Sequence, residues 1–457
     1  MKIEEILAKQ RAYFNTGATL PVSFRVEQLK KLNAAVKRHE RDIATALKAD
    51  LGKSDYESFI CESGLACTEI SHMIRNTARY AREKTVHTPL AQFAARCYQK
   101  PCPYGNVLIM SPWNYPFLLS IDPLADAIAA GNTAIIKPSA YSPATAALIK
   151  QIIEECFDEE YVAVITGGRQ ENAELLNQKF DFVFFTGSQN VGKEVLRHTA
   201  ETLTPAVLEL GGKSPCIVDS TAKLSLAAKR IVFGKLVNCG QTCVAPDYIL
   251  CHESVKDALI EELKKQITQQ YGEHVLDNPD YGRIVNRKHF DRICGLIGLD
   301  KVVFGGKTNA DTLQIEPTIM DNVTLADAVM QQEIFGPIIP VLTYKELDEV
   351  YIMLQDRAKP LALYIFSEDK HVIDEITARC RYGGGCVNDV VVHLSTTSMG
   401  FGGVGESGMG AYHGKIGFDT FSHTKSIMDK KTWLDLPMRY QPYRRELYYK
   451  MLHWVLK

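Results

Sequence analysis

Asn106-Val107-Leu108-Ile109-Met110-Ser111-Pro112-Trp113-Asn114-Tyr115-Pro116 joins a short apolar run to a turn that two prolines make stiff. Further apolar runs follow along the chain, at residues 133–136, 161–165, 182–185 and 206–210. Stretches with helical periodicity, such as 144–156 and 191–199, lie between them. Strands that alternate with helices in this way predict parallel βαβ units. Open sheets of this kind bind ligands at the carboxyl ends of their strands, where the turn at 111–116 lies.

The alternation starts again after Gly212 and predicts a second α/β unit. Its apolar runs are at residues 216–218, 248–251, 302–304, 338–342 and 361–366. Before the first unit, residues 1–85 carry apolar side chains at three- and four-residue steps, which predicts helices. The glycine-rich segments 383–385 and 400–410 are predicted to be loops. The pattern therefore predicts an α/β protein with two open α/β domains.

Composition limits the kind of partner and the compartment. The chain of 457 residues has 52 basic and 54 acidic side chains, a formal net charge of −2, which argues against a nucleic-acid partner. Its first residues, Met-Lys-Ile-Glu-Glu, lack the apolar run of a signal peptide. No segment approaches the roughly 20 apolar residues that cross a bilayer, so no integral membrane segment is expected. We expect a cytoplasmic protein.

The twelve cysteines are scattered, and without a secretory signal they are expected to be reduced thiols. Cys239 and Cys243 are separated by three residues, not by the two that are common in zinc sites, and no second pair follows. No metal site is expected.

Cys243 is the candidate nucleophile. In Asn238–Pro246, Gly240 allows the backbone to approach a ligand closely, and consecutive N–H groups at Thr242 and Cys243 suit a developing oxyanion. The alternative for any single cysteine is an apolar residue of the core.

Three polar residues follow predicted strands or end them. Asn114 is a candidate oxyanion donor or an asparagine that satisfies its own turn. Lys137 ends a strand and could bind ribose hydroxyls or a phosphate, or be solvated. Glu209 closes an apolar strand before two glycines, so it is either a general base or the partner of a lysine.

Residues 187–193 match the phosphate-loop pattern G-x-x-x-x-G-K, but Glu194 stands where Ser or Thr would hold magnesium. A nucleotide hydrolase is therefore excluded. Thr186-Gly187-Ser188 followed by a helix near Val191 still predicts a seat for a pyrophosphate at a helix N-terminus. Glu333 and Phe335, two residues apart in an extended turn, could hold a sugar hydroxyl and a flat ring together, although Phe335 could equally be a core residue.

Six motifs together resemble the aldehyde dehydrogenase superfamily, and the likeness covers nearly the whole chain. They are Pro-Trp-Asn-Tyr-Pro at 112–116, Lys-Pro-Ser at 137–139, Phe-Thr-Gly-Ser at 185–188, Glu-Leu-Gly-Gly-Lys at 209–213, Gly-Gln-Thr-Cys at 240–243 and Glu-Ile-Phe-Gly-Pro at 333–337. Three features resemble the dimeric class 3 branch. They are the short N-terminus, residues 243–248 and the basic, aromatic tail.

The resemblance implies a Rossmann-like cofactor domain, a catalytic domain and a small β oligomerisation arm. The expected boundaries are 1–85 with 106–209 for the dinucleotide-binding domain, 210–410 for the catalytic domain, 86–105 with 411–430 for the arm, and 431–457 for a C-terminal tail. A homodimer is implied. The tail carries apolar residues at helical spacing between Arg444 and Lys457 and is expected to pack on its own or a partner subunit.

The resemblance also implies the roles of single residues. Cys243 would be the nucleophile, Glu209 the general base and Asn114 the oxyanion donor. The implied cofactor-binding residues are Trp113, Lys137, Ser139, Ala140, Thr186, Gly187, Ser188, Val191, Leu210, Gly211, Glu333 and Phe335. Many family members have Glu at the position of Ala140, where it holds the adenosine ribose and repels a 2′-phosphate. With Ala140, Lys137 would be free to pair with that phosphate, so we expect both NAD and NADP to be used.

The implied reaction is NAD(P)-dependent oxidation of an aldehyde to a carboxylic acid through a thiohemiacetal and a thioester on the cysteine. Trp113, Tyr115 and Phe401 beside the catalytic motifs suggest a medium-to-large apolar or aromatic aldehyde. A CoA-acylating aldehyde dehydrogenase and an inactive structural relative are the alternatives. The retained Glu209 argues against the first, because the CoA route does not need that base. The retention of Cys243, Glu209 and Asn114 together argues against the second.

Overall fold

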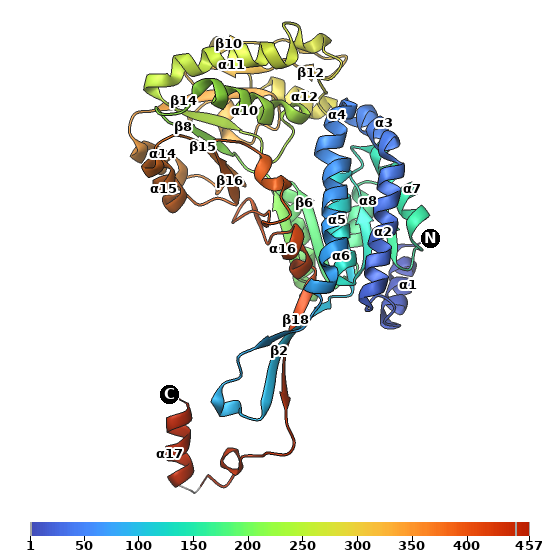
Figure 1. The fold of residues 1–457 in the computed structure, drawn as a ribbon. Helices are drawn as coiled ribbons and strands as arrows, with labels where there is room; N and C mark the ends of the chain where they lie inside the picture. Colours follow the sequence, from blue (N-terminus) through green and yellow to red (C-terminus); the bar gives the residue numbers. More distant parts are fainter. Residues whose placement is uncertain (1, 444–445, 457) are drawn as a thin grey trace.

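The computed structural model describes residues 2–443 and 446–456 (Figure 1). Its first body is built on a six-stranded sheet in the order β17-β7-β6-β3-β4-β5, parallel except for β17. The strands are β3 (Asn106–Met110), β4 (Thr133–Lys137), β5 (Val162–Val164), β6 (Phe182–Gly187), β7 (Ala206–Leu210) and β17 (Gly408–Met409). The expectation of a parallel sheet over 106–210 is confirmed.

Helices cover both faces of this sheet because its strands are apolar on both sides. On one face lies α6 (Leu118–Ala130), all of whose residues are buried. It packs against α2 (Val22–Arg38), α5 (Gly64–Tyr80) and α16 (Gly414–Thr420). On the other face, α1 (Ile3–Asn15) contacts β3 and β4, and α9 (Gln189–Thr202) contacts β6 and β7. The remaining helices of this body are α3 (Glu40–Leu51), α4 (Asp55–Ser58), α7 (Pro143–Cys156) and α8 (Arg169–Leu176).

The second body has a seven-stranded sheet in the order β10-β13-β14-β9-β8-β15-β16, with only β10 antiparallel. Its strands are β8 (Pro215–Val218), β9 (Tyr248–His252), β10 (Val302–Phe304), β13 (Thr318–Met320), β14 (Ile338–Tyr344), β15 (Ala362–Phe366) and β16 (Gly384–Val387). Its helices are α10 (Leu224–Leu236), α11 (Lys256–Tyr271), α12 (Arg287–Cys294), α13 (Ala328–Gln331), α14 (Leu347–Gln355) and α15 (Lys370–Arg379), and a small hairpin pairs β11 (Thr308–Asn309) with β12 (Gln314–Ile315). The prediction of a fold with two open α/β sheets is confirmed.

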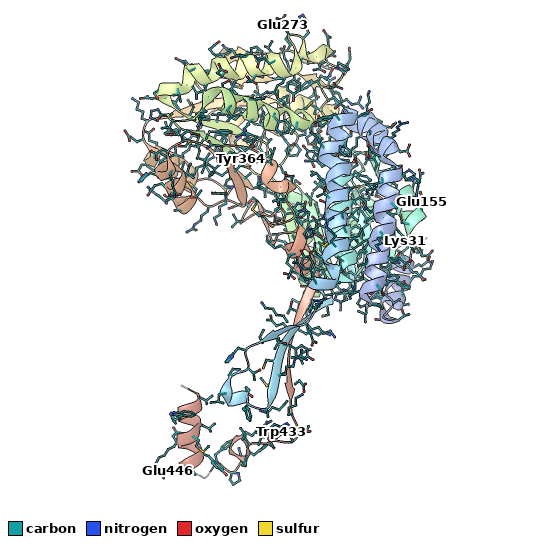
Figure 2. All side chains as sticks on the ribbon, in the orientation of Figure 1. Lys31, Glu155, Glu273, Tyr364, Trp433 and Glu446 are labelled. Carbon is teal, nitrogen blue, oxygen red and sulfur yellow. The ribbon has the colours of Figure 1, made fainter. Side chains whose placement is uncertain are left out.

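An arm leaves the first body as a three-stranded antiparallel sheet in the order β1-β2-β18 (Figure 1). It consists of β1 (Lys84–Val86), β2 (Ala95–Pro103) and β18 (Ser422–Lys430). Segments more than 300 residues apart thus pair over the full length of β18. Beyond the arm, Trp433 and Glu446 lie far from both bodies (Figure 2), and α17 (Glu446–Val455) forms the helix that the tail pattern predicts. Arg444 and Lys457, the limits of that prediction, lie outside the described residues.

The prediction that residues 383–385 form a loop is wrong. Gly384 and Gly385 belong to β16, the edge strand that pairs with β15. A Cβ on Gly385 would clash with the Leu363 carbonyl across the strand pair, so glycine is needed for close approach there. Part of the second glycine-rich segment is also a strand, since β17 pairs with β7 and Gly408 lies opposite Glu209.

No helix in the described ranges 2–443 and 446–456 is long and apolar enough to cross a membrane. Within the same ranges, no group of three or more His, Cys, Asp or Glu side chains is placed to hold a metal ion. All twelve cysteines are free thiols.

Candidate active site

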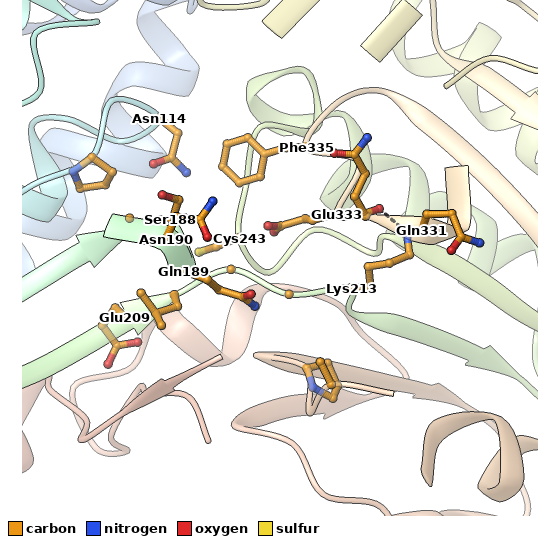
Figure 3. Close-up of a pocket in the computed structure, with 18 of the residues that line it drawn as sticks. Asn114, Ser188, Gln189, Asn190, Glu209, Lys213, Cys243, Gln331, Glu333 and Phe335 are labelled. Carbon is orange, nitrogen blue, oxygen red and sulfur yellow. Dashed lines mark hydrogen bonds between the residues drawn. The ribbon is translucent and has the colours of Figure 1, made fainter. Parts of the chain in front are cut away.

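A cavity of about 750 Å³ lies between the two bodies, at the carboxyl ends of β6 and β7. Cys243, Glu209 and Asn114 reach it from three separate segments of the chain (Figure 3). The predicted cofactor residues that also line it are Trp113, Thr186, Gly187, Ser188, Leu210, Gly211, Glu333 and Phe335. The structure therefore brings the three candidate catalytic residues and eight of the candidate cofactor residues to one space.

The Cys243 loop owes its shape to a run of left-handed backbone. Asn238, Cys239 and Gly240 have φ values of 52°, 52° and 75°. A side chain on Gly240 would clash with the carbonyl of Gly336, so the glycine allows the loop to lie against that segment. The Gln241 amide fixes the loop further by donating to the Asn238 and Arg283 carbonyls, both at 3.0 Å.

Buried charges from the N-terminal helices brace the same loop. Lys53 and Glu62 form a fully buried ion pair at 2.5 Å. Lys53 Nζ also donates to the backbone carbonyl of Asn114 at 3.0 Å, and Asn238 Nδ2 donates to the same oxygen at 2.7 Å. Glu57 accepts the Asn238 N–H at 2.8 Å. The turn with Asn114 and the loop with Cys243 are thus held to each other through one network.

These bracing residues were missed in the sequence. Lys53, Glu57 and Glu62 look like ordinary charged residues of a helical segment, and their burial depends on contacts with residues 114–118 and 238. Glu62 also accepts the N–H groups of Phe117 and Leu118, both at 2.9 Å, at the start of α6. The one available signal was a cluster of four charged residues, these three and Asp55, within ten positions of a segment predicted to be helical.

Cys243 is half-buried, and the pKa of its thiol is raised to about 12. Burial is the main cause, and the carboxylates of Glu333 and Glu209 add to it because negative charge disfavours a thiolate. The thiol therefore carries its proton at neutral pH, and its activation requires transfer of that proton.

Glu209 is 2% exposed, and neither of its carboxyl oxygens has a hydrogen-bond partner within the described part of the chain. Burial raises the pKa of Glu209 well above its usual value. Among the described residues Glu209 forms no ion pair. The structure therefore does not support the alternative in which Glu209 is the partner of a lysine. An unpartnered carboxyl on a residue that lines a cavity is a candidate for proton exchange with a molecule bound there.

Asn114 is buried, and its side-chain Nδ2 donates to the Gln241 carbonyl at 2.9 Å. An amide has two N–H hydrogens, and the second one has no hydrogen-bond partner within the described residues. The neighbouring Tyr115 hydroxyl pairs with the Thr242 hydroxyl at 2.6 Å. Its ring does not line the 750 Å³ cavity, and neither does Phe401. Of the three aromatic residues expected beside the aldehyde, only Trp113 does so.

Glu333 and Phe335 form the opposite wall. Phe335 has a φ of 51°, and its ring packs edge-to-face with the Trp113 ring, with the two ring centroids 5.3 Å apart. Burial raises the pKa of Glu333 to about 8, and the carboxylate of Asp247 adds to the shift. The segment is held by Arg292, which donates to the carbonyls of Glu333 and Ile334 at 3.1 and 2.6 Å.

Lys213 fixes the other side of that segment. It pairs with Asp247 and donates to the carbonyls of Val329 and Gln332, both at 2.9 Å. Lys213 and Arg292 were not singled out in the sequence, although Lys213 belongs to one of the six motifs.

Four predicted cofactor residues do not line this cavity. Ser139 and Ala140 line a separate, more open groove of about 520 Å³ along α7, and Val191 lies in the first turn of α9. Lys137 is 3% exposed and donates to the carbonyls of Pro138 and Gly167 at 2.9 and 2.8 Å. Two carbonyls already hold the Lys137 ammonium group, and burial lowers its pKa, so its pairing with a 2′-phosphate stays a prediction.

The aldehyde dehydrogenase family profile matches residues 1–427. The chain belongs to the aldehyde dehydrogenase family. It is 49% identical over 449 residues to a 4,4'-diaponeurosporen-aldehyde dehydrogenase of Staphylococcus aureus, covering 98% of both chains. It is 45% identical over 444 residues to a dimeric, NADP-preferring aldehyde dehydrogenase of Canis lupus familiaris, covering 96% of this chain and 98% of the relative.

A solved structure, the substrate-bound state of Staphylococcus aureus AldH, superposes with a TM-score of 0.97 at 48% identity. It covers 99% of this chain and all of that one. The molecule is thus an NAD(P)-dependent aldehyde dehydrogenase with the two-domain, Rossmann-like fold of that family, and the resemblance to its class 3 branch is confirmed.

The residues present fit a nicotinamide dinucleotide. Helix α9 begins after Ser188, and its first residues line the cavity, so its N-terminal N–H groups suit a pyrophosphate. Buried Thr186 Oγ1 has no hydrogen-bond partner within the described residues. A side chain on Gly211 would clash with the Glu333 carboxyl, so the backbone is kept open beside the wall that Glu333 and Phe335 form.

Proposed function

We propose that the enzyme oxidises aldehydes through a covalent intermediate on Cys243, with Asn114 as oxyanion donor and Glu209 as general base. The observation that carries the proposal is that these three residues line one cavity, the one that fits the dinucleotide (Figure 3). Covalent attachment divides one difficult oxidation into two easier steps.

In the first step, Cys243 Sγ gives up its proton to solvent water and bonds to the aldehyde carbon. The carbonyl oxygen becomes an oxyanion that accepts from the free Asn114 amide N–H and the Cys243 backbone N–H. Loss of one such donor typically reduces the rate by roughly 10²–10³. A nicotinamide held beside Glu333 and Phe335 would supply the acceptor for the hydride of that carbon, and a thioester would remain on Cys243.

In the second step, Glu209 takes a proton from water, and the oxygen of that water attacks the thioester carbon. The C–S bond breaks, the carboxylic acid leaves, and the sulfur is protonated again. A buried carboxyl without fixed partners suits this task, because nothing else competes for its lone pairs.

The adenosine end of the cofactor is assigned to the groove with Ser139 and Ala140. Because Ala140 neither binds the ribose diol nor repels a 2′-phosphate, we propose that NADP is used at least as well as NAD. The relative that is named NADP-preferring supports this proposal.

The proposed substrate is a medium-to-large apolar or aromatic aldehyde. The Staphylococcus aureus relative is named for 4,4'-diaponeurosporen-aldehyde, and each buried methylene adds about 0.8 kcal/mol of binding. We expect kcat/KM to rise with chain length across a panel of aliphatic aldehydes before it levels off. A best substrate as small and polar as glyceraldehyde 3-phosphate would contradict this expectation.

Formation of NAD(P)H, followed by absorbance with and without CoA, tests the proposed reaction. Turnover without CoA supports hydrolysis of the thioester by water. Turnover only with CoA would indicate the acylating reaction, and no turnover with any aldehyde would indicate an inactive relative.

The domain division proposed above assigns 1–85 with 106–209 to the cofactor, 210–410 to catalysis and 86–105 with 411–430 to the arm. We further propose a homodimer formed through the arm, which exposes the large apolar side chains of Leu90 and Phe93. Trp433, beyond the arm, is exposed as well (Figure 2). The canine relative is named dimeric. Light scattering of the full chain measures the oligomeric state.

A cytoplasmic location is proposed because twelve free thiols suit a reducing compartment.

A further inference from the structure

A second cavity of about 340 Å³ lies in the catalytic body and is lined by residues of α14, α15 and β15 and of the segments beside them. Four basic side chains line it, and no acidic one does. The lining residues are Tyr351, Leu354, Gln355, Arg357, Lys359, Pro360, Leu363, Arg379, Cys380 and Arg381. The proposed reaction uses none of the four basic residues.

Two of these cations, Arg379 and Arg357, already have partners in the protein. Arg379 pairs with Asp348 at 3.1 Å and Glu375 at 3.4 Å, and its guanidinium lies 3.7 Å from the centre of the Tyr351 ring. Arg357 donates to the Met330 carbonyl at 2.5 Å. These contacts fix the position of both guanidinium groups, and Arg357 keeps its full charge because a carbonyl is neutral.

Lys359 and Arg381 have no ion pair or side-chain hydrogen bond within residues 2–443 and 446–456. Lys359 is half-buried, and Arg381 is exposed at the rim. Like charges that share one small cavity repel each other, and this repulsion is stronger near protein than in bulk water. An anion inside the cavity would remove the repulsion and satisfy the unused donors.

We propose that this cavity binds a phosphate-bearing small molecule. Arginine is suited to phosphate because its planar N–H groups match two phosphate oxygens at once, and here three arginines and a lysine face one space. The volume is that of a small-ligand site, and Leu354, Pro360 and Leu363 offer apolar surface for the rest of the ligand.

The site is distinct from the proposed catalytic centre but shares a wall with it. Leu354, Arg357 and Pro360 line both cavities. Lys359 also lies against Gly405, in the loop before β17. Strand β17 pairs with β7, where Gly408 lies opposite Glu209. The proposal does not depend on the assignment of Cys243, because the cations and their cavity are separate from that residue.

Calorimetric titration with inorganic pyrophosphate tests the site. The full-length enzyme first receives one equivalent of NADP, so that the pyrophosphate seat at α9 is filled. We expect the wild type to bind pyrophosphate, and Arg381→Ser and Lys359→Met each to weaken binding about tenfold or more, since a charge-assisted hydrogen bond contributes about 1.5–3 kcal/mol. Arg197→Ser removes an exposed arginine on α9 and is the matched control, expected to bind like the wild type.

Three results would overturn the proposal: no binding by the wild type, unchanged binding by both cavity variants, or equal weakening by Arg197→Ser. A parallel titration with malonate checks the ligand class, and malonate binding as tight as pyrophosphate would contradict the choice of phosphate. Dehydrogenase activity without pyrophosphate should be the same in Arg381→Ser and the wild type. That measurement separates failure of this site from failure of the proposed reaction.

Discussion

The two ends of the proposed cofactor site differ in how firmly the protein holds them. At the Cys243 end, the loop is fixed by left-handed backbone, by the Gln241 amide and by the buried Lys53–Glu62 pair. At the other end, Ser139 and Ala140 line an open groove, and the nearest buried cation, Lys137, is bound to backbone carbonyls. The chemical end is built from many mutually dependent contacts, whereas the adenosine end depends on a few independent side chains.

This difference predicts large effects of substitution at the first end and small ones at the second. Groups that act as a unit lose most of their function when one member is removed, whereas independent contacts contribute about 1–3 kcal/mol each. Four substitutions test the contrast, in decreasing order of expected effect.

Cys243→Ala should reduce aldehyde oxidation by at least about 10⁴-fold, because no other group can form the thioester. Cofactor binding, measured by fluorescence titration, should remain. Cys97→Ala, on the arm, is the control and should retain activity. If Cys243→Ala retains activity, Cys243 is not the nucleophile.

Lys53→Met should lower the free energy of unfolding by about 3–5 kcal/mol, because it leaves Glu62 buried without its partner. Urea denaturation measures the change. The double variant Lys53→Met with Glu62→Gln should recover part of the loss, since no uncompensated charge then remains. If Lys53→Met is as stable as the wild type, the network does not brace the loop.

Glu209→Gln should slow hydrolysis of the thioester by about 10²–10³ while hydride transfer is affected less. Rapid mixing should then show a burst of NAD(P)H followed by a slow phase. In the wild type the slow step should accelerate as pH rises, because the raised pKa of Glu209 leaves less of the base form at low pH. Equal loss in both phases, or the same pH dependence in the variant, would mean that Glu209 does not act as the base.

Ala140→Glu should change the preference towards NAD by about tenfold, equal to about 1.4 kcal/mol. The new carboxylate would bind the ribose hydroxyls and repel a 2′-phosphate. The measurement is kcat/KM for both cofactors in the variant and the wild type, with Ala140→Gln as the uncharged control. A wild type that strongly prefers NAD would show that another residue determines cofactor choice.

Much of the fold was predictable from local pattern, because buried strands such as Asn106–Met110 and Ala206–Leu210 are short apolar runs between helices. The misassigned strand β16 shows the limit. Glycine is needed at Gly385 because the Leu363 backbone lies close to it across the strand pair. The local sequence does not indicate that Leu363 will be its neighbour.

The site shows the same limit. Cys243, Glu209 and Asn114 could be singled out because each lies in a turn or at a strand end within a recognisable motif. Lys53 and Glu62 could not, because burial alone distinguishes them from solvated helix residues. The contacts of Lys137 could not be predicted either, since the Gly167 carbonyl that accepts from it is 30 residues away in the sequence.

The pairing of β17 with β7 and of β18 with β2 has a consequence for how the chain folds during synthesis. The edge strand beside Glu209 and the third strand of the arm both come from residues after 400. Gly414 N–H also bonds Glu69 across 345 positions of sequence. The N-terminal body therefore cannot complete its sheet until nearly the whole chain has left the ribosome, and β7 remains an open strand edge for most of translation. Such edges favour association with other chains, so the nascent protein depends on rapid completion or on chaperones at that stage.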